Sequence, residues 1–115
     1  MYLMDAIVDS EGRNWPMAGI FPTRARMQTR LAKLGYIEVK SCEADAWLAP
    51  GESARGHEFR YSAMDPMPKT ISRVYCDPAE GYRVRSVLGS YIHLHFLSNP
   101  RFAESFVRDC ARRRA

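Results

Sequence analysis

The sequence predicts a single α/β domain, and three observations lead to this prediction. Short segments with alternating or apolar side chains recur along the chain, as is typical of strands. Turn residues such as Pro50-Gly51 and Asp65-Pro66 separate these segments. The last of them, residues 89–96, is followed by Asn99-Pro100, which indicates a helix with Asn99 as its N-cap. The length of 115 residues allows one domain, and 46% apolar residues suffice for one modest core.

The expected elements follow from local patterns. Residues 1–8 are dense in apolar side chains and are interpreted as the remainder of a longer helix. Residues 15–22 are interpreted as a short buried strand, whereas residues 24–34 fit either a helix or an amphipathic strand. Further strands are expected at 36–40, 56–63, 71–76, 82–87 and 89–96, with a loop over 44–53. A final helix is expected over 100–113, and its buried face would consist of Phe102, Phe106, Val107 and Cys110.

Charge and cysteine content narrow the class of protein. The net charge is +4, and the run Arg112-Arg113-Arg114 is interpreted as a helix C-terminus rather than a nucleic-acid site, because no nucleic-acid-binding motif accompanies it. The three cysteines, Cys42, Cys76 and Cys110, are odd in number and widely spaced, which favours reduced thiols in a cytoplasm over a disulfide framework. No apolar run approaches the length of a membrane span. Neither nucleic acid nor membrane is expected as a partner.

The three histidines lie in two unusual stretches. His93 and His95 are placed near the end of a predicted strand that leads into a helix, at the edge where open α/β sheets bind ligands, and alternation puts both on one face. His57 lies in the second stretch, residues 55–62. The alternative is that all three are packed or solvated structural side chains. The His-x-His pair permits a zinc site, but no CxxC or HExxH spacing supports one, so no metal site is predicted.

Both stretches resemble motifs of a known family. Residues 55–62, RGHEFRYS, are similar to the RGHEFHYS motif of cobyrinate a,c-diamide synthases, and residues 90–96, SYIHLHF, resemble their SYxHLHF motif. The resemblance implies a flavodoxin-like, class I glutamine amidotransferase sheet with flanking helices. It further implies glutamine hydrolysis, with ammonia passed to an ATP-activated carboxylate of a corrin ring in cobalamin biosynthesis. ATP and magnesium would belong to an N-terminal domain. A neighbouring family that amidates nickel sirohydrochlorin is an alternative.

One departure from the family pattern affects the expected activity. In the family a Cys-Gly-Gly turn carrying the nucleophile precedes the residues that correspond to Met1-Tyr2-Leu3. We therefore expect that residues 1–115 are the C-terminal portion of such a domain, without nucleophile or ATP domain and inactive alone. The sheet would be incomplete, with an exposed apolar face that favours self-association. The alternatives are a subunit that completes a site with another chain, and a non-catalytic binding module.

The resemblance also assigns roles to residues. His93 matches the catalytic histidine of the family and would act as the base, while His95 stands where many class I relatives have an orienting Glu. Arg55, His57 and Glu58 would bind the α-carboxylate and α-amino groups of glutamine. For Arg55 and Glu58 the alternative is an ordinary exposed ion pair. None of the three cysteines lies in a sequence context that suits a replacement nucleophile.

Overall fold

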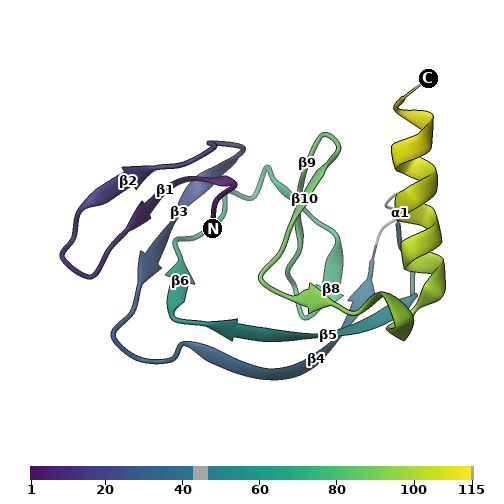
Figure 1. Cartoon of the computed structure of the whole chain (residues 1–115), viewed down its shortest axis with the longest axis horizontal. Coiled ribbons are helices and arrows are strands. Elements are labelled where there is room, and N and C mark those ends of the chain that lie inside the picture. Colours follow the sequence, from purple (N-terminus) through teal and green to yellow (C-terminus); the bar gives the residue numbers. More distant parts are fainter. Residues whose placement is uncertain (43–46, 115) are drawn as a thin grey trace.

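The structure is a computed structural model that describes residues 1–42 and 47–114. It consists mainly of short strands, with one α-helix near the C-terminal end of the described chain (Figure 1). The elements are, in order, β1 (Met4–Val8), β2 (Asn14–Pro16), β3 (Phe21–Met27), β4 (Lys33–Ser41), β5 (Ser53–Arg60), β6 (Ser62–Met64), β7 (Ser72–Arg73), β8 (Tyr75–Asp77), β9 (Tyr82–Val84), β10 (Val87–Gly89), β11 (His93–Leu94), a 3₁₀ turn η1 (Phe96–Ser98) and α1 (Pro100–Arg112).

The strands form three small sheets, with the orders β2-β1-β3-β6, β10-β9-β7 and β11-β5-β4-β8. β1 and β3 pair in parallel, whereas the other ladders of the described chain are antiparallel. β4 and β5 form a long ribbon along the bottom of Figure 1, which connects the β1–β3 end of the molecule with the α1 end. The fold is therefore of mixed α/β character, as the sequence predicts.

Two apolar clusters hold the sheets together. The larger one joins β4, β5 and β8 to the first turn of α1, and its buried members are Val39, Leu48, Ala54, Val74, Tyr75, Ile92 and Phe102. The smaller one lies under β3 and β9 and contains Phe21, Met67 and Tyr82. Both clusters are small, and several large apolar side chains outside them are exposed, among them Leu34, Tyr36, Phe59, Leu97 and Val107. Small divided cores of this kind bury little apolar area for the length of the chain.

Two of the sequence predictions for the N-terminal part are wrong. Residues 4–8 form strand β1 instead of a helix, because Ile7 and Val8 pair on both sides, with β2 and with β3. The expected buried strand over 15–22 is divided: β2 ends at Pro16 and is exposed throughout, and β3 begins only at Phe21. For residues 24–34 the strand alternative holds, since β3 runs to Met27 and β4 starts at Lys33.

The C-terminal part agrees better with expectation. Strands occupy most of 36–40 and 56–63, and β7 pairs with β9 as part of the expected strand pair 71–76 and 82–87. The expected strand over 89–96 is reduced to His93–Leu94, because a turn precedes it and η1 follows it. The predicted loop 44–53 lies partly outside the described residues.

The final helix is confirmed, with one correction on its buried face. The side chain of Asn99 accepts the backbone N–H of Arg101, and Pro100 occupies the first turn. Phe102 is buried, whereas Phe106, Val107 and Cys110 are exposed, so the predicted apolar face is largely uncovered. No helix within 1–42 and 47–114 combines the length and apolar character needed to cross a membrane.

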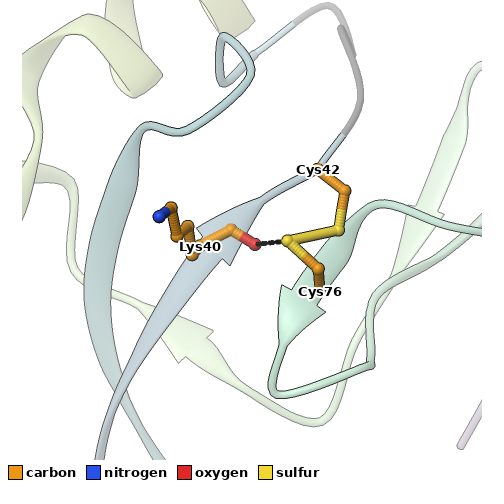
Figure 2. The surroundings of a disulfide bond; sticks show 3 residues. All are labelled: Lys40, Cys42 and Cys76. Atoms are coloured by element: carbon orange, nitrogen blue, oxygen red, sulfur yellow. Dashed lines mark hydrogen bonds between the residues drawn. A yellow bond between two sulfur atoms is a disulfide. The ribbon is translucent and has the colours of Figure 1, made fainter.

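The expectation of three reduced thiols is wrong for two of them. Cys42, just after β4, and Cys76, on β8, form a disulfide between residues 34 positions apart in sequence (Figure 2). The antiparallel pairing of Lys40 with Asp77 and of Ser41 with Tyr75 brings the two Cα atoms to 5.3 Å, which is an ordinary disulfide separation. This pairing depends on sheet register, which cysteine spacing alone does not reveal. Cys110 is a free thiol.

Candidate functional site

The two histidine stretches come together in the β11-β5-β4 sheet. β11 pairs antiparallel with β5, with His93 opposite His57 and Leu94 opposite Gly56. The two imidazole rings contact each other edge to face, with centroids 4.9 Å apart and planes inclined by 62°. Both side chains are exposed, on the outer face of the sheet. The structure thus brings into direct contact two of the residues that the sequence analysis singled out, one from each histidine stretch.

Gly56 makes this close pairing possible. A Cβ atom built on Gly56 would lie 2.7 Å from the carbonyl carbon of His93 and 2.9 Å from the Cα of Leu94. Such distances are shorter than real Cβ atoms show, so any other residue would push β11 away from β5. Further contacts extend the pairing, because the backbone N–H of His95 donates to the carbonyl of Arg55 (2.8 Å) and the Ser98 hydroxyl accepts the Arg55 N–H (2.8 Å).

The outer face around the histidines is rich in aromatic and charged groups. Tyr36 lies opposite His57 in the register and is 98% exposed, and Phe59 lies two pairs further along, opposite Leu34. Arg55 lies on the same face and forms an exposed ion pair with Glu38 across the strands (2.9 Å). The exposed ion pair considered for Arg55 therefore exists, with Glu38 instead of Glu58 as its partner.

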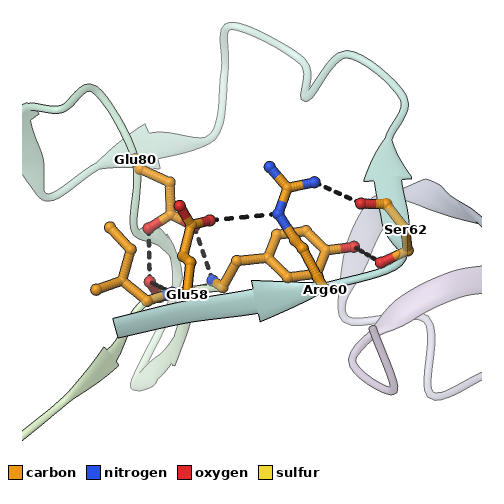
Figure 3. Close-up of polar contacts among 7 residues, drawn as sticks. Glu58, Arg60, Ser62 and Glu80 are labelled. Atoms are coloured by element: carbon orange, nitrogen blue, oxygen red, sulfur yellow. Dashed lines mark hydrogen bonds and ion pairs between the residues drawn. The ribbon is translucent and has the colours of Figure 1, made fainter. Parts of the chain in front are cut away.

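Glu58 lies on the opposite, inner face of β5, because residues alternate between the two faces of a strand. Its side chain is buried and accepts from the Arg60 Nε atom at 3.3 Å (Figure 3). Arg60 also donates to the carbonyl of Ser62, and its guanidinium lies over the Tyr91 ring, 4.6 Å from the centroid. Ser62 and Tyr91 share a hydroxyl–hydroxyl hydrogen bond of 3.2 Å.

A second carboxylate, that of the half-buried Glu80, faces this inner network. Its two oxygens accept the hydroxyl of Ser90 (2.5 Å) and the backbone N–H of Tyr91 (2.8 Å), and the Ser90 hydroxyl oxygen accepts the N–H of Ile92 (2.9 Å). Burial raises the pKa of Glu80, and the charge of Glu58 adds to that rise, although the Ser90 and Tyr91 hydrogen bonds oppose it. Glu80 therefore holds the turn that leads directly into His93.

His93 lines a pocket of about 330 Å³ beside these groups. The volume is large enough for a small polar ligand such as an amino acid. Aromatic rings and hydroxyls dominate the lining, together with one guanidinium, and its members are Met1, Met27, Phe59, Arg60, Tyr61, Ser62, Ser90, Tyr91 and His93. Neither His57 nor any of the three cysteines lines it.

The structure thus divides the residues predicted from sequence. His93, His57 and Arg55 share the outer face, whereas Glu58 points inward. Sequence reasoning missed Arg60 as a pocket residue, and it missed Glu80 altogether. Alternation along 55–62 could have separated Glu58 and Arg60 from His57. Nothing in the local pattern at Glu80 indicates its contact with residues ten positions later.

Comparison with known proteins agrees with these motifs. The CobB/CobQ-like glutamine amidotransferase domain family matches residues 1–101. The chain is 38% identical over 122 residues to the cobyrinate a,c-diamide synthase of Leptospira interrogans, covering 98% of this chain and 27% of that protein. It is also 38% identical to the synthase of Thermoplasma volcanium, covering 97% of this chain and 26% of the relative. For the Salmonella typhimurium synthase the identity is 33%, over 93% and 25%.

The chain spans about a quarter of the length of these relatives. The match nevertheless includes both histidine stretches, because it extends from residue 1 to residue 101 and so takes in β5, the turn before β11, and His93 itself. These comparisons and the motifs establish that the chain belongs to the CobB/CobQ-like glutamine amidotransferase domain family.

Proposed function

We propose that this chain supplies the histidine side of a glutaminase site in a cobyrinate a,c-diamide synthase, with His93 as the general base. The observation that carries the proposal is the position of His93. Its imidazole is exposed, contacts His57, and lines a 330 Å³ pocket together with hydroxyls and a guanidinium. Imidazole is the usual base for activating a nucleophile at neutral pH.

Cysteine-dependent amide hydrolysis also requires a thiol within reach of the base. Cys42 and Cys76 are joined to each other, Cys110 lies on α1, and none of them lines the pocket at His93. We therefore place the nucleophile and its oxyanion donors in a segment other than the described residues. That segment would complete the sheet toward the flavodoxin-like arrangement, and the exposed outer face around Tyr36 and Phe59 is available for it.

The predicted substrate-binding residues receive separate roles in this proposal. His57 supports His93 by direct ring contact. To bind the glutamine α-carboxylate, Arg55 gives up its ion pair with Glu38. This exchange costs little free energy, because exposed ion pairs contribute little to stability. Glu58 acts on the pocket through Arg60, whose guanidinium it orients.

We propose the substrates and cofactors by analogy with the relatives. Glutamine would be the ammonia donor, and a corrin side-chain carboxylate the acceptor, with nickel sirohydrochlorin as the competing tetrapyrrole. ATP and magnesium would act elsewhere in the longer protein. In residues 1–42 and 47–114 no three His, Cys, Asp or Glu side chains gather where they could hold a metal ion, so no step is assigned to a metal in this chain.

The test is ammonia release from glutamine. The purified chain is expected to release none above background. In a longer protein that includes the nucleophile segment, His93→Ala should lower turnover by about three orders of magnitude or more, as loss of a base does in comparable triads. His95→Ala is the matched control, because it removes the other imidazole of the same motif, and should have a much smaller effect. His93-dependent ammonia release by the chain alone would contradict the proposal, since one of its cysteines would then reach His93.

A further inference from the structure

We infer that Glu80 is a positioning residue for His93, acting through the turn formed by Ser90, Tyr91 and Ile92. This inference rests on the proposed role of His93 and names the group that fixes where its imidazole stands. Glu80 precedes β9, whereas His93 begins β11, so the link is tertiary and not local.

The contacts form a short chain from carboxylate to strand. One Glu80 oxygen accepts the Tyr91 N–H at 2.8 Å and the other accepts the Ser90 hydroxyl at 2.5 Å. The oxygen of that hydroxyl accepts the Ile92 N–H at 2.9 Å. Two successive backbone N–H groups immediately before His93 are thereby held by one carboxylate, directly or through Ser90. Hydrogen bonds to an ionised acceptor are stronger than neutral ones, so this turn is firmly held.

The other side of the turn is held by the inner face of β5. The Tyr91 ring lies under the Arg60 guanidinium, and its hydroxyl meets the Ser62 hydroxyl. Arg60 in turn is oriented by Glu58. The turn is thus fixed at its backbone by Glu80 and at its Tyr91 side chain by β5. Figure 3 shows Glu58 and Glu80 close together at one end of this network, with Arg60 and Ser62 toward the other end. Arg60 compensates the charge of the buried Glu58, and the hydrogen bonds at the turn stabilise the carboxylate of the half-buried Glu80.

The geometric consequence concerns the ring contact between His93 and His57. β11 is only two residues long and makes its sheet contacts with β5 alone among the described strands. Such a short pairing is weak by itself. The position of the His93 ring therefore depends on what fixes the preceding turn, and the Glu80 carboxylate is directly hydrogen-bonded to the Tyr91 backbone N–H and the Ser90 hydroxyl of that turn.

The experiment uses nuclear magnetic resonance on this chain, so its readouts do not require glutaminase activity. In Glu80→Ala the ring-to-ring NOE between His57 and His93 should disappear. The His95 amide, which donates to the Arg55 carbonyl, should exchange at least tenfold faster. Amides of the β4–β5 ladder should keep their protection. Glu80→Gln should restore the NOE and most of the protection, because its amide can accept from Tyr91 N–H and donate to the Ser90 oxygen.

A matched control separates this role from general stability. Glu52 is another largely buried glutamate that accepts a backbone N–H, from Ala49 at 2.9 Å, and it does not contact the turn. Glu52→Ala should leave the His57–His93 NOE intact. Ser90→Ala is a smaller change and should weaken the NOE only partly. This second variant keeps the inference testable if Glu80→Ala does not fold. An unchanged NOE and unchanged His95 exchange in both Glu80→Ala and Ser90→Ala would overturn the inference, whatever the ammonia assay shows for His93.

Discussion

Replacing Gly56 with alanine should separate β11 from β5 and disrupt the candidate site without touching a functional side chain. The added Cβ would lie 2.7 Å from the His93 carbonyl carbon, whereas ordinary contact begins at 3.4 Å. The difference requires the strands to move apart by at least 0.7 Å (3.4 minus 2.7). The obstructing atoms are backbone, which cannot rotate away as a flexible side chain can.

The expected cost can be worked from this overlap. Overpacking in a tight site costs about 1–3 kcal/mol, and a backbone obstruction belongs at the upper end of that range. We therefore expect the free energy of unfolding of Gly56→Ala, measured by urea denaturation, to fall by about 2–3 kcal/mol. The ring contact of His57 and His93 should be lost as well. In an active longer protein, a misplacement of about 1 Å should lower glutaminase turnover by roughly 100-fold.

Gly12→Ala is the matched control for this substitution. Gly12 lies in the turn between β1 and β2, its φ is 80°, and a Cβ there would meet nothing within 4 Å. Its replacement should cost about 1 kcal/mol from backbone strain alone and should leave the histidine contact unchanged. If Gly56→Ala is as mild as Gly12→Ala and the His57–His93 NOE persists, the reasoning from the close strand approach is refuted.

Three further predictions concern stability. Asp9 accepts hydrogen bonds from Trp15 Nε1 and Arg13 Nε, both at 2.8 Å, and these bonds lower the pKa of Asp9. Asp9→Asn should therefore destabilise the β1–β2 hairpin at neutral pH, and the difference from the parent should disappear as the pH falls through that lowered pKa. Hydrogen exchange of the β1 amides measures this difference. Burial raises the pKa of Glu80 above its ordinary value of 4.5, so its contribution to unfolding free energy should fall as the pH rises from 4.5 through that raised value, and Glu80→Gln should remove this fall in parallel titrations. The Cys42–Cys76 bond closes a loop across 34 positions, and Cys42→Ser should lower the free energy of unfolding by about 2–4 kcal/mol under non-reducing conditions, with no difference between variant and parent after reduction.

The elements that sequence reasoning predicted well are those specified by local chemistry. The start of α1 depends on local chemistry at two residues. The Asn99 side chain accepts a free backbone N–H group of the first turn, and Pro100 has no backbone N–H that would need a partner. β4 was predicted over 36–40 from its alternation, which exposes Tyr36 and Glu38 and buries Val39. These features require no knowledge of distant residues.

The elements that were mispredicted depend on partners far along the chain. Residues 4–8 are dense in apolar groups, and such a run is compatible with a helix or a buried strand. β1 is a strand because β2 and β3 flank it on both sides. The disulfide has the same origin, since the β4–β8 register brings Cys42 to Cys76. Register is set by tertiary packing, which local composition does not encode.

The candidate site shows the same division within a single strand. The motif over 55–62 reads as one polar cluster in sequence, yet alternation sends His57 to the outer face and Glu58 to the inner face. The outer residue contacts the His93 ring directly, while the inner one orients Arg60 against Tyr91, two residues before His93. Both halves of the motif therefore act on the same imidazole from opposite sides of the sheet. A substitution on either face should therefore displace His93, because the ring contact of His57 and the contacts from Glu58 through Arg60 to Tyr91 both end at the same short segment.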